Sequence, residues 1–110
     1  MTDKIVVLAT CGTVKEARRI ARALVEARLA ACVNIMPGAV ESIYRWKGRI
    51  ASAKERLVVI KTSRRRFAAV EREIRRLHSY QVPEIIALPV TQGSRDYMAW
   101  MSACISGSKK

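Results

Sequence analysis

The 110-residue sequence contains few histidines, aromatic residues and acidic residues. Its single histidine excludes a site built on two imidazoles from one chain. Six aromatic side chains are present, and nine acidic residues stand against 21 lysines and arginines. No stretch approaches the roughly twenty apolar residues that a membrane-spanning helix requires, so we expect no membrane segment.

The three cysteines, Cys11, Cys32 and Cys104, are odd in number and show no CxxC spacing. The first apolar run, residues 5–9, is too short for the central region of a signal peptide. Together these features predict a reduced protein in the cytoplasm rather than a disulfide-linked secreted one.

The motifs of common catalytic classes are also missing. The sequence has no serine nucleophile elbow, no histidine and carboxylate motif at metal-ligand spacing, and no glycine-rich phosphate loop. Gly12-Thr13, at the start of a predicted helix, is only a generic anion site. We therefore expect a binding protein and not an enzyme.

The formal net charge of +12 suggests an acidic partner, and nucleic acid is the first candidate. However, the arginines of the predicted helices alternate with glutamates, and no recognition helix, RNP motif or zinc-finger spacing accompanies them. A solvated basic surface is therefore favoured over a nucleic-acid interface. The run Arg64-Arg65-Arg66 stands out, because it falls in a first helical turn, where the helix dipole disfavours cations.

Apolar periodicity and turn residues predict an alternating order of strands and helices. Thr13 to Glu16 forms a capping box, Ser63 can cap the second helix, and Lys47-Gly48 is a turn signal. The segment 36–38 (Met-Pro-Gly) predicts a bend within one long strand. The expected elements are a strand at 5–10, a helix from 13 to about 29, a bent strand over 31–46, a strand at 49–61, a helix from 63 to about 78, a strand at 85–90 and a helix from 94 to about 104.

This order predicts an α+β fold of the ferredoxin-like βαββαβ class, with a four-stranded antiparallel sheet, a long hairpin between the second and third strands, and an added C-terminal helix. Residues 1–110 form one domain, and we expect the tail at 106–110 to fray. Three strands are apolar on consecutive residues, which indicates burial of both sheet faces. Two helices cover only one face, so we expect an obligate oligomer.

The segment 77–86 (LHSYQVPEII) places the only histidine, a tyrosine and a glutamate in a corner before a strand. Pro83 cannot continue a helix and favours extended backbone before it. His78 can ligate a metal, or it can simply hydrogen-bond the last carbonyls of the helix; the two interpretations are evenly balanced on sequence.

Several ordered motifs resemble the CutA family of divalent-cation tolerance proteins. They are residues 29–35 (LAACVNI), 42–48 (SIYRWKG), Glu55, 60–62 (IKT), Tyr80, 82–86 (VPEII), Gly93-Ser94, Tyr97 and Trp100. The resemblance implies a homotrimer similar to the signalling protein PII. It also implies a cytoplasmic protein of copper and divalent-metal tolerance, with copper or another divalent cation as its ligand.

The family's metal hypothesis rests on a cysteine after the first strand and on paired histidines after the second helix. Here His78 follows Leu77, and the nearest thiol is Cys11 because position 9 is alanine. The resemblance therefore implies His78 and Cys11 as metal ligands, with incomplete coordination. A packed Cys11 and a hydrogen-bonding His78 form the competing, and favoured, interpretation.

In the trimer that the resemblance implies, the aromatic residues concentrate near subunit contacts, so their default role is packing and interface anchoring. A cleft between subunits is the sharper interpretation. Lys61, Tyr80, Glu84, Glu55 and Trp46 are its candidate residues. Lys61 is either a snorkelling residue or a ligand-facing cation. Glu84 could cap the strand corner, pair with Lys61 or bind a metal, and pairing is the most economical of the three. An alternative function is therefore a PII-like regulatory module that binds a small anionic ligand in this cleft.

Overall fold

The structure is a computed structural model that describes residues 2–106; the predicted tail beyond Ser106 lies outside the described residues. The chain forms five strands, three α-helices and one 3-10 turn in this part. They are β1 (Lys4–Cys11), α1 (Val14–Glu26), β2 (Cys32–Ile35), β3 (Val40–Trp46), β4 (Arg49–Ser63), the 3-10 turn (Arg64–Arg66), α2 (Phe67–Leu77), β5 (Ile85–Pro89) and α3 (Arg95–Ser106).

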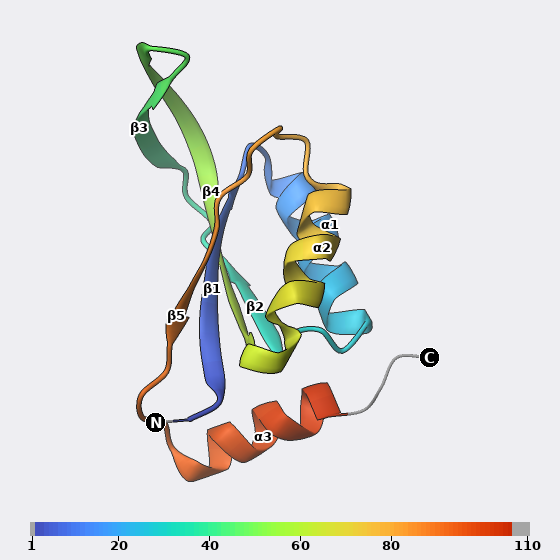
Figure 1. Cartoon of the computed structure of the whole chain (residues 1–110). Coiled ribbons are helices and arrows are strands. Elements are labelled where there is room, and N and C mark those ends of the chain that lie inside the picture. Colours follow the sequence, from blue (N-terminus) through green and yellow to red (C-terminus); the bar gives the residue numbers. More distant parts are fainter. Residues whose placement is uncertain (1, 107–110) are drawn as a thin grey trace.

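The strands form one mixed-length antiparallel sheet with the order β2-β4-β1-β5, and β3 pairs with the outer part of β4. Helices α1 and α2 cover one face of this sheet, while α3 crosses the end at which the N-terminus lies (Figure 1). The β3–β4 hairpin projects beyond the helices at the opposite end (Figure 1). The predicted α+β class with an antiparallel sheet is therefore confirmed.

The predicted four-stranded sheet with one bent strand over 31–46 is wrong, because two separate strands occupy this range. Ile35 pairs with Val58 and Val40 pairs with Glu55, so the four residues 36–39 lie opposite only two residues of β4. Pro37 has no N–H to donate to a strand ladder. The extra residues therefore form a connection outside the sheet between β2 and β3.

Helix α1 begins as predicted but ends earlier than expected. The Thr13 side chain accepts a hydrogen bond from the Glu16 amide at 3.1 Å, which is one half of the predicted capping box. The helix ends at Glu26, not near residue 29, because Arg28 takes the left-handed conformation with φ of 59°.

The second helix has no side-chain cap from Ser63, contrary to the prediction. The chain enters α2 through the 3-10 turn Arg64–Arg66, and the buried hydroxyl of Ser63 has no hydrogen-bond partner. The Lys47-Gly48 turn is confirmed: φ is positive at both residues, 52° and 78°, as a tight hairpin turn requires.

The core lies between the helix-covered face of the sheet and helices α1 and α2. Alternate residues of β1, including Val7 and Cys11, pack there against Leu24 and Ile74. The opposite sheet face is also apolar but is not covered: Ile86 and Leu88 of β5 are 50% and 49% exposed. Within residues 2–106, no helix is long and apolar enough to cross a membrane.

Candidate functional site

His78 is a structural clamp between the end of β1 and the corner that follows α2. One ring nitrogen, Nε2, lies 2.7 Å from the carbonyl oxygen of Thr10, and the other, Nδ1, lies 3.0 Å from the backbone nitrogen of Tyr80. A carbonyl oxygen only accepts hydrogen bonds and a backbone N–H only donates them, so Nε2 carries the proton and Nδ1 accepts. This arrangement assigns a neutral imidazole in one tautomer.

The same corner contains three side chains that could bind a metal ion. Ligand atoms of Cys11, Glu16 and His78 all lie within 4.8 Å of one another. They come from the end of β1, the first turn of α1 and the residue after α2. The structure thus places the predicted pair Cys11 and His78 together and adds a carboxylate.

Sequence reasoning missed Glu16 because it fitted the capping box so well. In the structure its carboxylate does not reach back to its own helix start; it accepts hydrogen bonds from the Ser79 amide at 2.7 Å and the Ser79 hydroxyl at 3.3 Å. The spacing along the chain, 63 residues, gives no local signal of this contact. Only the packing of α1 beside α2 brings the two residues together.

The electrostatic surroundings of Cys11, Glu16 and His78 disfavour metal binding. Burial, together with the negative charges of Glu16 and Glu55, raises the pKa of the Cys11 thiol to about 12. The thiol is therefore protonated near neutral pH, although a metal binds the thiolate. A thiol, an imidazole and a carboxylate are ligand types that suit copper or zinc. However, His78 and Glu16 already have hydrogen-bond partners, so a bound ion must displace the Cys11 proton and at least one of these hydrogen bonds.

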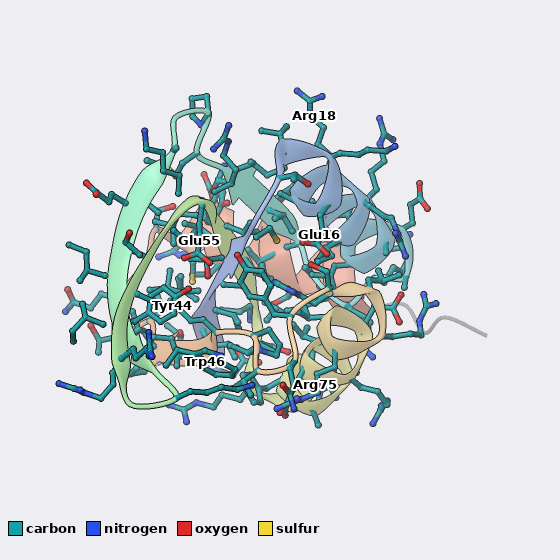
Figure 2. The ribbon with its side chains drawn as sticks, turned by 90° about the horizontal axis from the view of Figure 1, so that it is seen from above. Glu16, Arg18, Tyr44, Trp46, Glu55 and Arg75 are labelled. Carbon is teal, nitrogen blue, oxygen red and sulfur yellow. The ribbon has the colours of Figure 1, made fainter. Side chains whose placement is uncertain are left out.

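A separate cleft lies on the other side of β1. Figure 2 shows Glu55, Tyr44 and Trp46 along the inner side of the curved β3–β4 hairpin, with β1 between Glu55 and Glu16. The cleft has a volume of about 630 Å³. Its lining residues are Thr10, Ser42, Ile43, Tyr44, Trp46, Glu55, Tyr80, Gln81, Val82 and Glu84.

A hydrogen-bond network forms the inner wall of the cleft. The Tyr80 hydroxyl donates to one oxygen of Glu55 at 2.7 Å, and the Ser42 hydroxyl donates to the other at 2.7 Å. Burial, and next the hydrogen bond to Glu55, raise the pKa of Tyr80 well above its usual value of 10.0. The network joins β3, β4 and the corner, so the cleft wall is fixed by three elements.

Of the five residues predicted for a cleft between subunits, four line this cleft within the single chain, namely Trp46, Tyr80, Glu55 and Glu84. Lys61 does not. It lies six residues beyond Glu55 along β4, which is roughly 20 Å at the rise of an extended strand. Its ammonium lies 5.7 Å from the ring centre of Tyr97 in α3, and the considered ion pair with Glu84 does not form among residues 2–106.

Comparisons with known proteins agree on one family. The family model described as "CutA1 divalent ion tolerance protein" matches residues 5–104. The "Divalent-cation tolerance protein CutA" of Thermus thermophilus is 49% identical over 96 residues, covering 87% of this chain and 92% of that protein. "Protein CutA, chloroplastic" of Arabidopsis thaliana is 41% identical over 97 residues, 88% of this chain but only 53% of that longer protein.

A solved structure supports the fold assignment independently. The structure titled "Periplasmic divalent cation tolerance protein CutA" from Archaeoglobus fulgidus superimposes with a TM-score of 0.89 at 35% identity. The match covers 93% of this chain and 98% of the other. The similarity therefore extends over the sheet, the hairpin and all three helices.

We predict that the Tyr80 phenol ionises well above the usual tyrosine pKa of 10.0. Its raised pKa places the titration above 10.0, and Glu55→Gln moves the midpoint down, because it removes the carboxylate but not the burial. Folding stability from this phenol is full below pH 10.0 and is lost as pH rises further, since the unfolded phenol ionises first. Ultraviolet titration of tyrosinate measures this; a midpoint unchanged by Glu55→Gln would contradict it.

Proposed function

The chain belongs to the CutA1 divalent ion tolerance family, and on that basis we propose that it is a non-enzymatic homotrimer that binds copper or another divalent cation in metal tolerance. The observation that carries the metal proposal is the convergence of Cys11, Glu16 and His78 within 4.8 Å. The family description names tolerance of divalent ions, which agrees with a binding role.

The chemistry of the three donors favours a borderline or soft metal. Thiolate and imidazole suit copper and zinc, whereas magnesium and calcium prefer oxygen ligands alone. Three protein ligands leave at least one position for water or another ligand. Because each donor must give up a proton or a hydrogen bond, we propose modest affinity that responds to pH.

We predict that metal affinity rises with pH and depends on Cys11. The thiol, with a pKa of about 12, holds its proton at pH 6 to 8, so the ion competes with one proton and gains about tenfold in affinity per pH unit. Cys11→Ser removes the ligand and lowers the affinity about tenfold or more. Calorimetric titration with Zn²⁺, which does not oxidise thiols, measures both effects, followed by Cu²⁺.

Cys32→Ser is the matched control for this experiment. Cys32 pairs with Lys61 on β4, a register that places it on the sheet face opposite Cys11, and the substitution also removes one thiol. The control should bind zinc as the unaltered protein does. Equal zinc affinity of the Cys11→Ser variant and the Cys32→Ser control would show that Cys11 is not a metal ligand.

The trimer proposal rests on the uncovered sheet face and on the family resemblance. The order β2-β4-β1-β5, with both crossover helices on one face, supports the ferredoxin-like plan, in which the second face is free to pack. On that face Ile86 and Leu88 expose about half of their surface. Exposed apolar side chains on an uncovered sheet face are typical of an interface.

We predict that light scattering gives the mass of three chains and that Leu88→Glu weakens assembly at least tenfold, because it buries an unpaired charge. Arg18→Glu is the control: Arg18 projects into solvent from α1 (Figure 2) and should leave the mass unchanged. A stable monomer of the unaltered protein would overturn this proposal.

A cytoplasmic location is also part of the proposal, supported by three free cysteines and no disulfide among residues 2–106. Relatives carry names that place them in chloroplasts and in the periplasm, so the family itself spans several compartments. The alternative of a small anionic ligand gains no support from the cleft, whose lining includes Glu55 and Glu84 but no lysine or arginine.

A further inference from the structure

The two helices that cover the sheet differ in how their basic residues are neutralised. Both helices alternate arginines with glutamates, a pattern that on sequence favours a solvated basic surface. In α2 the alternation produces ion pairs, Arg75 with Glu71 at 3.4 Å and Arg76 with Glu73 at 2.7 Å. The charges of these two arginines are therefore balanced within the helix itself.

Helix α1 instead carries a row of cations without such partners. The members of this α1 row are Lys15, Arg18, Arg19 and Arg22. All four are exposed, and the ion pairs found between residues 2 and 106 include none of them. Glu16 does not pair with the row, because its carboxylate accepts hydrogen bonds from Ser79. Figure 2 shows Arg18 pointing away from the protein.

The spacing places the α1 row on one side of the helix. Its members follow Lys15 at intervals of three, four and seven residues, so the row spans roughly 10 Å along the helix axis. Like charges at these intervals repel one another, and cations near the start of a helix also oppose its dipole. The α1 row therefore lowers the stability of the free protein, and an anionic partner would offset that loss.

The α1 row lies on the side of the helix that faces away from the sheet. The buried residues of α1, among them Ile20 and Leu24, form its opposite, core-facing side. Helices α1 and α2 cover one face of the sheet (Figure 1), and the proposed interface between copies uses the other. An assembly through that other face leaves the α1 row exposed, and each chain contributes one row.

The residues around the row indicate the chemistry of its partner. Helix α1 contains no aromatic residue, so it offers no ring on which the bases of a single strand stack. Its large apolar side chains, Ile20 and Leu24, pack into the core, whereas a helix that lies on a membrane inserts such side chains into the lipid. Arginine binds phosphate through two hydrogen bonds, and duplex DNA carries one negative charge per about 1.7 Å of its axis. A row of roughly 10 Å can therefore contact several phosphates at once.

We propose that the outer face of α1 binds duplex nucleic acid through the phosphate backbone. The α1 row supplies the contacts, and binding does not depend on base sequence, since phosphates carry no sequence information. The proposal is independent of metal binding, because no member of the row belongs to the group Cys11, Glu16 and His78.

Fluorescence anisotropy with labelled DNA duplexes of about 12 base pairs tests this proposal. Four phosphate contacts predict a slope of about −3.6 for log affinity against log salt concentration, which is roughly a hundredfold loss between about 50 and 200 mM salt. Two duplexes of unrelated sequence should bind equally. Vesicles that contain phosphatidylserine should compete at least about tenfold less well than unlabelled duplex at equal phosphate concentration.

Charge-matched variants assign the binding to α1. Arg18→Gln combined with Arg22→Gln should lower the affinity at low salt at least about tenfold and reduce the steepness of the salt dependence by about two. Arg18→Lys combined with Arg22→Lys keeps both charges and should retain most of the affinity. The control, Arg45→Gln combined with Lys54→Gln, removes two exposed cations of the β3–β4 hairpin and should change the affinity less than about threefold.

Three results would contradict the proposal. Absence of duplex binding at low salt would remove it outright. Equal losses in the α1 glutamine variant and the hairpin control would show that the net charge of the protein, not the α1 row, attracts the duplex. Tighter binding of the vesicles than of the duplex would assign the row to a membrane surface.

Discussion

The contact between His78 and the end of β1 determines where both candidate sites form. Its imidazole donates to the carbonyl of Thr10 and accepts from the amide of Tyr80, so a single ring connects the central strand to the corner between α2 and β5. This connection fixes the corner relative to Cys11 and Glu55, together with the hydrogen bonds of Ser79 to Glu16 and of Tyr80 to Glu55. His78 is therefore first a positioning residue, whatever it binds.

Tyr80 links the two sites across the sheet. Its backbone amide bonds the His78 ring, its own ring lies 4.7 Å from that imidazole, and its hydroxyl bonds Glu55 in the cleft. If a metal bound Nδ1 of His78, the hydrogen bond from the Tyr80 amide would break. The Tyr80 side chain, which bonds Glu55, would carry that change to the cleft. The group Cys11, Glu16 and His78 and the cleft thus differ in chemistry, but Tyr80 contacts both.

The sequence predicted the parts that depend on local pattern. Thr13 capped its helix, and Lys47-Gly48 turned the hairpin. What it could not predict depends on contacts distant in sequence. Glu16 satisfied a local motif yet bonds Ser79, and Lys61 shares a strand with Glu55 but lies beyond its reach. The break at 36–39 was predicted as a bend, because a proline does not reveal how many residues the opposite strand supplies.

The central claim, that the His78 imidazole is a fixed two-sided clamp, is tested most directly by nitrogen-15 NMR of the imidazole ring. The account predicts one neutral tautomer with the proton on Nε2, an Nδ1 shifted by the hydrogen bond from the Tyr80 amide, and a slowly exchanging Tyr80 amide proton. A proton on Nδ1, or rapid averaging between the two tautomers with a freely exchanging Tyr80 amide, would contradict it.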